Sequence, residues 1–337
     1  MTDVNRQVRL AQRPQGMLTP EVWEITEEPL GEPSDGQVLV GVEMLSLDPA
    51  MRGWLNDVPS YVPPVGIGEV MRAGGVGRVR SSADERFSEG DWVTGVTGVQ
   101  EYALLDAAAL TPIDTSLAAP ETYLGALGIS GMTAYFGLLD IGRPEPGQTV
   151  VVSGAAGSVG SLVGQIARIR GCRSVGIAGG PEKCAWLTEE LGFDAAVDYR
   201  AAELRTELKR AAPDGIDVFF DNVGGEILDL ALTRLSRGAR IVICGAISQY
   251  NASAAVAGPS NYLSLLVKRA TMTGFVVFDY AGRYGEAARE IAGWLGDGSL
   301  VAREEVIDGG VEAFGETLLR LFRGENTGKL VLRVGAS

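Results

Sequence analysis

Three glycines spaced three residues apart stand between an apolar strand and an apolar helix, a combination that can hold a phosphate group. Gly154, Gly157 and Gly160 follow the β-branched run Val150 to Val152. In such a turn the first glycine permits the bend, the second lets a pyrophosphate approach the backbone, and the third allows close packing of helix on strand. The helix then directs its first N–H groups and its positive dipole end at the phosphates. The motif predicts a dinucleotide site. A plain strand-to-helix turn is the alternative, because the spacing is Gly-x-x-Gly-x-x-Gly.

The residues after the second strand favour NADPH over NADH. NAD-specific folds usually have an acidic residue there, which binds the adenosine ribose hydroxyls. Here the strand ends in Gly179 and Gly180, and Lys183 follows at the start of the next helix. An ammonium beside two glycines suits a 2′-phosphate, with Tyr199 and Arg200 as further contacts. The alternative makes Lys183 an ordinary solvated helix residue.

Composition indicates an acidic intracellular protein with two domains. A chain of 337 residues with 46% hydrophobic residues exceeds what one core usually fills. Its net charge of −14 argues against nucleic acid or an anionic membrane surface as a partner. Cys172, Cys184 and Cys244 are too few and too scattered for a disulfide framework. No signal peptide or membrane-spanning run is evident, so we expect a cytoplasmic enzyme.

The chain contains no histidine. This excludes Ser-His-Asp and Cys-His catalysis and removes the commonest metal ligand. Any proton chemistry must therefore fall to tyrosine, lysine, a carboxylate, a cofactor hydroxyl or water.

The order of elements predicts an α/β protein with a Rossmann domain and a mostly-β, barrel-like domain. Short strands at 38–42, 76–79 and 92–96 alternate with turn residues in the first part of the chain. Strands predicted at 174–178, 195–197, 217–221, 240–244 and 271–277 alternate with helices at 182–191, 202–211 and 225–235. That alternation is typical of a doubly wound parallel sheet. We expect residues 1–122 and 299–337 to form the β domain and residues 123–298 the Rossmann domain, with a helical stretch at 123–139.

Several motifs in a fixed order resemble one enzyme family. They are Ser46-Leu47-Asp48-Pro49 with Met51-Arg52-Gly53, Gly68-Glu69-Val70-Met71, Gly131-Met132-Thr133-Ala134-Tyr135-Phe136-Gly137, Ala155-Ala156-Gly157-Ser158-Val159-Gly160, Phe220-Asp221-Asn222-Val223-Gly224-Gly225, Cys244-Gly245-Ala246-Ile247-Ser248-Gln249-Tyr250-Asn251, Gly274-Phe275-Val276-Val277 and Asn326-Thr327-Gly328-Lys329. The chain resembles a medium-chain dehydrogenase/reductase of the zinc-independent group, which includes prostaglandin reductase, leukotriene B4 12-hydroxydehydrogenase and curcumin or alkenal double-bond reductases. The resemblance covers nearly the whole chain.

The resemblance implies a GroES-like substrate domain, a Rossmann NADPH domain, an active site in the cleft between them, and a homodimer. Zinc-dependent relatives have a Cys near positions 45–47 and a Gly-His-Glu where this chain has Ile67-Gly68-Glu69. Both metal ligands are missing, so we expect no metal. The implied reaction is NADPH-dependent reduction of the carbon-carbon double bond in small hydrophobic α,β-unsaturated ketones or aldehydes.

The resemblance also assigns cofactor contacts. They are Gly157, Ser158, Val159, Gly160, Lys183, Tyr199, Asn222, Cys244, Gly245, Ala246, Ile247, Tyr250, Phe275, Val276, Val277 and Asn326. Structural alternatives remain, since Cys244 suits the core of a strand and Asn222 suits a turn.

Substrate and catalytic residues follow less directly. Tyr61, Met132 and Tyr262 are the predicted substrate contacts, and Tyr262 and Tyr250 are the candidate proton donors. The family's tyrosines near the substrate are replaced by Ala50 and, by alignment, Val267.

Hydride transfer to the β-carbon produces an enolate, whose oxygen needs a hydrogen-bond donor before the α-carbon is protonated. A ribose hydroxyl, a tyrosine or water could serve. Two rival functions are a zinc-free NADPH quinone reductase and a non-catalytic NADPH-binding protein.

Overall fold

The computed structural model describes residues 4–335, and the chain divides into two compact units. One unit runs to Gly125 and resumes at Glu304, and the other is Ala126–Arg303. The sequence placed the two boundaries at 122 and 298. The observed boundaries therefore lie three and five residues further along the chain.

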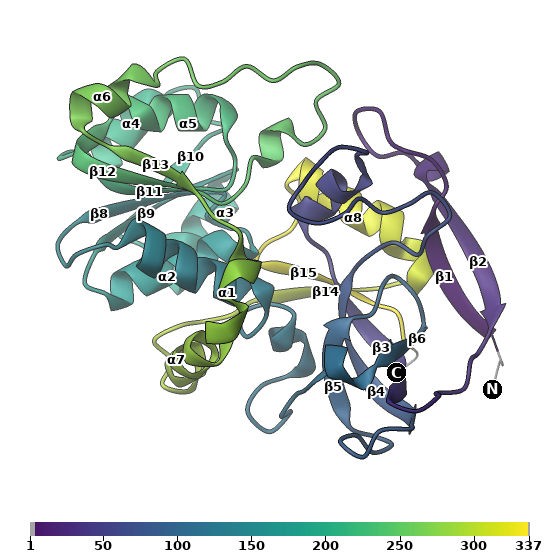
Figure 1. The fold of residues 1–337 in the computed structure, drawn as a ribbon. Helices are drawn as coiled ribbons and strands as arrows, with labels where there is room; N and C mark the ends of the chain where they lie inside the picture. The colour runs from purple at the N-terminus through teal and green to yellow at the C-terminus, as the bar shows by residue number, and fades with distance from the viewer. Residues whose placement is uncertain (1–3, 336–337) are drawn as a thin grey trace. The chain divides into compact units, whose positions relative to one another are not determined.

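The first unit is mostly β (Figure 1). Its main sheet has the order β14-β15-β3-β4-β5-β7, and β6 pairs with β3. These strands are β3 (Gln37–Ser46), β4 (Gly74–Ser82), β5 (Trp92–Val96), β6 (Tyr102–Asp106), β7 (Thr111–Pro112), β14 (Glu304–Asp308) and β15 (Lys329–Arg333). Neighbours are antiparallel except β14 and β15, which are parallel. A separate antiparallel pair is formed by β1 (Val4–Leu10) and β2 (Trp23–Pro29).

The core of this unit lies under α8 (Phe314–Arg323). Phe314 and Leu318, one helical turn apart, are fully buried in one cluster with Leu10 and Met51. The helix ends at Arg323, and Gly324 follows with a φ of 65°, a conformation that favours glycine after a helix. The segment after β3 forms η2 (Pro49–Leu55), which packs on α8.

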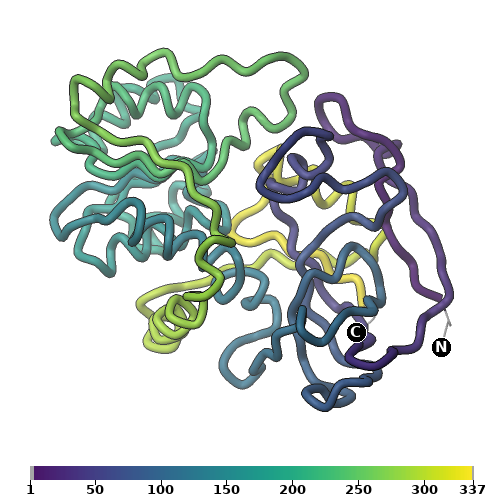
Figure 2. The backbone as a smooth tube through the Cα atoms, in the orientation of Figure 1, coloured from purple at the N-terminus to yellow at the C-terminus, as the bar shows by residue number. Residues whose placement is uncertain are grey.

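The second unit is a parallel sheet of six strands with the order β10-β9-β8-β11-β12-β13. The strands are β8 (Thr149–Ser153), β9 (Arg173–Ala178), β10 (Ala195–Asp198), β11 (Ile216–Asp221), β12 (Leu235–Ile243) and β13 (Thr271–Gly274). The helices are α1 (Ile129–Phe136), α2 (Ser158–Ile169), α3 (Pro181–Ala185), α4 (Leu204–Ala211), α5 (Gly225–Leu232), α6 (Leu263–Lys268) and α7 (Tyr284–Gly296). The backbone trace in Figure 2 shows how the chain alternates between these strands and helices.

Helices cover both faces of this sheet, which explains its apolar strands. Val150 and Val152 of β8 belong to one core cluster, with residues of α1, α2 and α7, while Val151 belongs to a second cluster with residues of α4 and α5. Alternate side chains of a strand point to opposite faces, so a strand covered on both sides is apolar throughout. The predicted fold class, a doubly wound parallel sheet plus a mostly-β domain, is confirmed.

Some element boundaries were predicted wrongly. The strand predicted to reach residue 277 ends at Gly274, opposite Ile243, which is the last residue of its only neighbour β12. The helix predicted to reach Leu235 ends at Leu232, because Leu235 pairs with Ile216 in the sheet. Apolar residues continue past Gly274, and Leu235 keeps the apolar spacing of α5 beyond its end, so hydropathy alone could not place these boundaries. Within the described residues, no helix combines the length and apolar character that crossing a membrane requires.

Candidate active site

The turn after β8 has the geometry that a phosphate-binding loop needs. Gly154 has a φ of 60°, which favours glycine. A Cβ on Gly160 would lie 2.3 Å from the carbonyl oxygen of Gly154 and 2.8 Å from the Cα of Ala155. Only a glycine at position 160 therefore lets α2 begin this close to the turn.

The start of α2 offers unpaired amides to a ligand. The first helical hydrogen bond of α2 is donated by the N–H of Ser161 to the carbonyl of Gly157, at 3.0 Å. By helix geometry the amides of Ser158, Val159 and Gly160 have no acceptor inside the helix. Three such N–H groups at the positive end of the helix dipole form an anion site, and a dinucleotide pyrophosphate fits it.

A buried carboxylate lies beneath this turn. The side chain of Asp221, at the end of β11, is 1% exposed. Its Oδ1 accepts hydrogen bonds from the Ser153 hydroxyl at 2.7 Å and from the amides of Val223 and Gly224, both at 3.0 Å. Burial raises the pKa of Asp221, and these bonds oppose that rise. Sequence reasoning did not include Asp221 among the site residues, although a carboxylate ending an apolar strand was a usable signal.

Asn222 links three strand ends. Its Nδ2 donates to the Ser153 carbonyl at 2.7 Å, its amide donates to the Ser153 hydroxyl at 2.9 Å, and its carbonyl accepts from the amide of Ile247 at 3.2 Å. These bonds support the turn-organising alternative for Asn222. Contact with a cofactor stays a prediction for this residue.

The ends of β9 and β10 bring the predicted 2′-phosphate contacts into one area. The ring of Tyr199 covers Gly179, where a Cβ would lie 2.8 Å from its Cε1, and the Arg200 guanidinium lies 5.8 Å from the centre of that ring. Gly180, whose φ is 95°, has no other group within 4 Å of the place of a Cβ. Lys183 lies three residues further, in α3. The arrangement leaves room for a group beside Gly180.

A carboxylate that sequence reasoning missed organises this area. Oδ1 of Asp198, the last residue of β10, accepts the amide of Gly180 at 2.8 Å and the amide of Arg200 at 2.9 Å. The strand β9 thus ends without an acidic residue of its own, but the carboxylate of Asp198 from β10 lies beside its end. Asp198 therefore fixes the turn after β9 through one of its two carboxylate oxygens.

The loop after β12 folds back on itself. The hydroxyl of Tyr250 accepts the amide of Ala246 at 3.2 Å, and a Cβ on Gly245 would lie 2.9 Å from that hydroxyl. Cys244 lies at the start of the loop. Burial and, to a lesser extent, Asp221 raise the pKa of its thiol to about 12, so the thiol stays neutral. This loop and Asn222 lie together, since Ile247 donates to Asn222.

The segment after β13 is anchored in the core of the same unit. Phe275 packs across Gly137, where a Cβ would lie 2.6 Å from the Phe275 ring, and the Val277 side chain is 9% exposed. The carbonyl of Val277 accepts the hydroxyl of Tyr284 at 3.0 Å. Val276 is only partly buried, so of the three predicted residues it has the freest side chain.

Tyr262 lies on the surface of the second unit. It precedes α6, and 59% of its surface is exposed. The two residues before it are held by Asp229 of α5, which accepts the Ser260 hydroxyl at 2.8 Å and the Asn261 amide at 3.0 Å. Asp229 is the fifth residue of α5, so Tyr262 stands beside the helix layer. Sequence reasoning gave no signal for the role of Asp229.

The remaining predicted residues lie elsewhere. Met132 is 2% exposed in the core of the second unit, which favours a packing role over substrate contact. Tyr61 and Asn326 belong to the first unit. Tyr61 is 53% exposed, and its hydroxyl accepts Nε1 of Trp54 at 3.4 Å. Asn326 is buried, with Nδ2 donating to the carbonyl of Gly328 at 3.0 Å.

The residues present do not fit a catalytic zinc. Histidine is missing from the whole sequence, and in residues 4–335 no three side chains of Cys, Asp or Glu gather as metal ligands would. Cys172, Cys184 and Cys244 are unpaired. The dinucleotide fits better, because the turn, the free amides and the open space at Gly180 all suit its phosphates.

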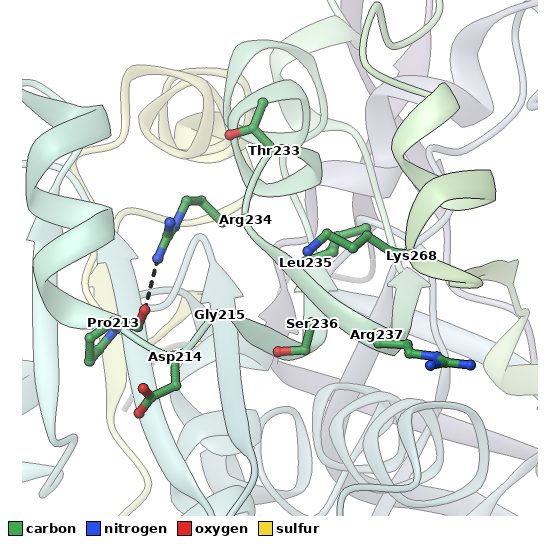
Figure 3. A pocket seen from close by; sticks show the side chains of 9 residues that line it. All are labelled: Pro213, Asp214, Gly215, Thr233, Arg234, Leu235, Ser236, Arg237 and Lys268. Atoms are coloured by element: carbon green, nitrogen blue, oxygen red, sulfur yellow. Dashed lines mark hydrogen bonds between the residues drawn. The ribbon is translucent and has the colours of Figure 1, made fainter.

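A cavity lies at the amino-terminal ends of β11 and β12 in the parallel sheet (Figure 3). It encloses about 290 Å³ near the first residues of β11 and β12. Arg234, Arg237 and Lys268 line it together with Asp214. Because dinucleotides bind at the carboxyl ends of such strands, this cavity at their amino ends has no part in the cofactor site.

Comparison with known proteins places these features in a family. A family described as the N-terminal domain of oxidoreductase matches residues 6–113, and one described as zinc-binding dehydrogenase matches residues 158–293. A Bacillus subtilis protein named as an NADP-dependent oxidoreductase is 47% identical over 99% of both chains. The NADPH-dependent curcumin reductase of Escherichia coli is 44% identical over 98% of this chain and 97% of its own.

A solved structure is similar throughout. It is CurA from Vibrio vulnificus in complex with NADPH, which has a TM-score of 0.94 and 43% sequence identity. The similarity covers 98% of this chain and 100% of that chain.

Proposed function

Since the chain belongs to the zinc-independent reductases of the medium-chain dehydrogenase/reductase family, we propose that it reduces the carbon-carbon double bond of α,β-unsaturated ketones and aldehydes with NADPH. The observation that carries this proposal is the phosphate cradle after β8, found in a chain 44% identical to a curcumin reductase over nearly its full length.

The proposed NADPH contacts come from several segments. The turn at Gly157 and the first amides of α2 would hold the pyrophosphate. Lys183 and Tyr199, with Arg200, would hold the 2′-phosphate, because a cationic group and an open glycine lie together there. The loop 244–250, the segment 275–277 and Asn326 complete the proposed set.

The protein's remaining task is to bind the enone and stabilise negative charge on its oxygen. When bound, NADPH supplies a hydride to the β-carbon. The enolate oxygen then needs a donor, and hydrogen-bond donors aimed at developing charge are often the largest catalytic contribution. Tyr250 and Tyr262 are the proposed donors from the chain, with Tyr61 as a proposed substrate contact. The Tyr250 hydroxyl accepts the amide of Ala246, and a tyrosine hydroxyl can also donate a hydrogen bond.

NADPH consumption with a panel of substrates tests this function. We expect turnover with enones and enals and formation of the saturated carbonyl product, identified by mass spectrometry. Turnover confined to quinones would replace the proposal by a quinone reductase. Tight NADPH binding without turnover of any enone, enal or quinone would replace it by a non-catalytic NADPH-binding protein.

We also propose that the protein is a homodimer formed through the edge of its parallel sheet. β13 is the outer strand of that sheet, and an outer strand has unpaired backbone groups that can bind a second chain. Beside it in sequence, α6 exposes Leu266 and Val267 at 76% and 62%. Light scattering should give the mass of two chains, and Leu266→Glu should give one. Leu117→Glu, at a site 72% exposed in the other unit, is the control and should leave the dimer intact.

A reducing compartment, the cytoplasm, is the proposed location. Cys172, Cys184 and Cys244 are all unpaired, and Cys172 is buried. Thiol titration of protein isolated and denatured without reductant should find all three thiols. A disulfide found in that material would contradict this location.

A further inference from the structure

The first unit contains an ion pair between a buried lysine and a partly exposed aspartate, and it joins two segments of the unit. Lys329, the first residue of β15, is 2% exposed, and its Nζ donates to Oδ1 of Asp48 at 2.6 Å and to the Leu47 carbonyl at 3.1 Å. The Ser46 hydroxyl donates to the other carboxylate oxygen of Asp48. One ammonium thus fixes the start of β15 against the segment between β3 and η2. A buried charge of this kind is costly without its partner.

The same ammonium holds one end of the loop that carries Asn326. This loop lies between α8 and β15, and Asn326 stands three residues before Lys329. Its other support is Glu305, whose Oε2 accepts the amide of Thr327 at 3.0 Å and whose Oε1 pairs with Arg320 at 2.6 Å. The position of Asn326 therefore depends on two charged anchors, Lys329 and Glu305.

Glu304 lies beside this pair without joining it. In the parallel register of β14 and β15, Glu304 is opposite Lys329, so the two side chains share a face of the sheet. Oε1 of Glu304 is enclosed and finds no hydrogen-bond partner in the described part of the chain. A Cβ on Gly125 would lie 2.9 Å from that oxygen and 3.5 Å from the Lys329 side chain. The carboxyl is thus packed between a backbone segment and the aliphatic part of Lys329.

The charges around Glu304 act in opposite directions. Burial is the largest influence on the carboxyl, and Glu121 of η4 (Pro120–Tyr123) adds to it, while Lys329 of β15 opposes both. Together they raise the pKa of Glu304 from 4.5 to about 7. The folded protein therefore holds this proton more tightly than the unfolded chain does.

We propose that Glu304 is a positioning residue. Its protonation controls the Asp48–Lys329 pair, and through that pair it controls the loop that carries Asn326. While neutral, Glu304 leaves the Lys329 ammonium to Asp48. When its proton passes to solvent water, a second carboxylate on the same face of the sheet, packed near the aliphatic part of Lys329, attracts the Lys329 ammonium and competes with Asp48. The loop then loses part of its support. The effect on cofactor binding rests on the proposed function, since Asn326 is a proposed NADPH contact.

Unfolding measurements test the proton linkage without any cofactor. The free energy of unfolding is measured in urea from pH 5 to pH 8.5, for the unmodified protein, Glu304→Gln and Glu121→Gln. A raised pKa in the folded state contributes stability that is fully present below about pH 4.5 and is lost as the pH rises to about 7. The unmodified protein should therefore lose stability relative to Glu304→Gln over this range. Glu121→Gln should shift the loss to lower pH, because it removes a negative charge from beside Glu304.

The matched control is Asp308→Asn, which removes an exposed carboxylate from the same strand, paired only with Arg333. It should follow the unmodified protein at every pH. A difference between the unmodified protein and Glu304→Gln that does not change with pH would overturn the proposal.

NADPH binding tests the positioning role. The dissociation constant is measured from pH 6 to pH 8 by fluorescence for the unmodified protein and Glu304→Gln. The NADPH 2′-phosphate also titrates near pH 6, but equally for both proteins, so their ratio isolates Glu304. We expect binding by the unmodified protein to weaken about tenfold relative to Glu304→Gln, equivalent to about 1.4 kcal/mol. A constant ratio would overturn the positioning role. Failure of NADPH to bind the unmodified protein at any pH would instead overturn the proposed function, and the unfolding measurements would then decide the linkage alone.

Discussion

Gly160→Ala should damage NADPH binding through a single added methyl group. A Cβ at position 160 would lie 2.3 Å from the carbonyl oxygen of Gly154, whereas ordinary contact begins at 3.4 Å. The turn or the helix must therefore move by about 1.1 Å. Both near contacts, Gly154 and Ala155, are backbone atoms that cannot rotate away. Forced overpacking of this kind costs about 1 to 3 kcal/mol of stability.

The same displacement acts on the ligand. The amides of Ser158, Val159 and Gly160 must all point at one pyrophosphate, and misplacement by about 1 Å can reduce a positioned interaction by roughly a hundredfold. We expect the NADPH dissociation constant to rise by about ten- to a hundredfold, with chemical denaturation and circular dichroism showing a folded protein.

The control is Gly293→Ala in α7, where a Cβ would have no neighbour within 4 Å. Alanine stabilises an exposed helix interior by about 0.8 to 1 kcal/mol over glycine, so this variant measures the propensity gain that Gly160→Ala also receives. It should be slightly more stable than the unmodified protein and bind NADPH equally. If Gly160→Ala binds NADPH as tightly as Gly293→Ala does, the cradle assignment is refuted.

Three further predictions concern the cofactor, the proton donor and the metal. In calorimetry, Lys183→Ala should weaken NADPH binding by about 1 to 3 kcal/mol and leave NADH binding nearly unchanged. Asp198→Asn keeps an acceptor for the Gly180 amide but removes a negative charge, so it should strengthen NADPH binding. Equal effects of these changes on both cofactors would contradict the 2′-phosphate assignment. Tyr250→Phe should chiefly raise the dissociation constant of NADPH. Tyr262→Phe should lower kcat by roughly a hundredfold or more if the Tyr262 phenol stabilises the enolate. Normal turnover in both variants would leave a ribose hydroxyl or water as the donor. Exhaustive chelation should leave turnover unchanged, and an activity restored by zinc would refute the metal-free mechanism.

The parts of the fold that the sequence predicted well are those whose causes are local. The run Val150 to Val152 is apolar because β8 is covered on both faces, and Gly154 and Gly160 are required by a positive φ and a close contact a few residues away. Each of these causes is visible in the residue types within about ten positions of the chain. The parallel sheet followed from repeating such local units.

The missed residues act through partners that are distant in the sequence. Asp221 binds Ser153, 68 residues earlier, and Lys329 binds Asp48, 281 residues earlier. Asp198 binds the amide of Gly180 because β9 and β10 end side by side, which only the register of these two strands reveals. Periodicity predicts that a strand is present but does not predict which of its polar end residues meet.

These long-range contacts also explain how a chain with a net charge of −14 can bind an anionic cofactor. Charges further away than about 8 Å are largely screened at physiological ionic strength, so the groups beside the ligand decide the interaction. The carboxylates nearest the strand ends, Asp198 and Asp221, accept two or more backbone amides each, and those bonds offset part of their charge. The charge that remains on Asp198 is what Asp198→Asn removes. In the proposed site, the first amides of α2 and the cationic side chain of Lys183 are the groups that attract the phosphates.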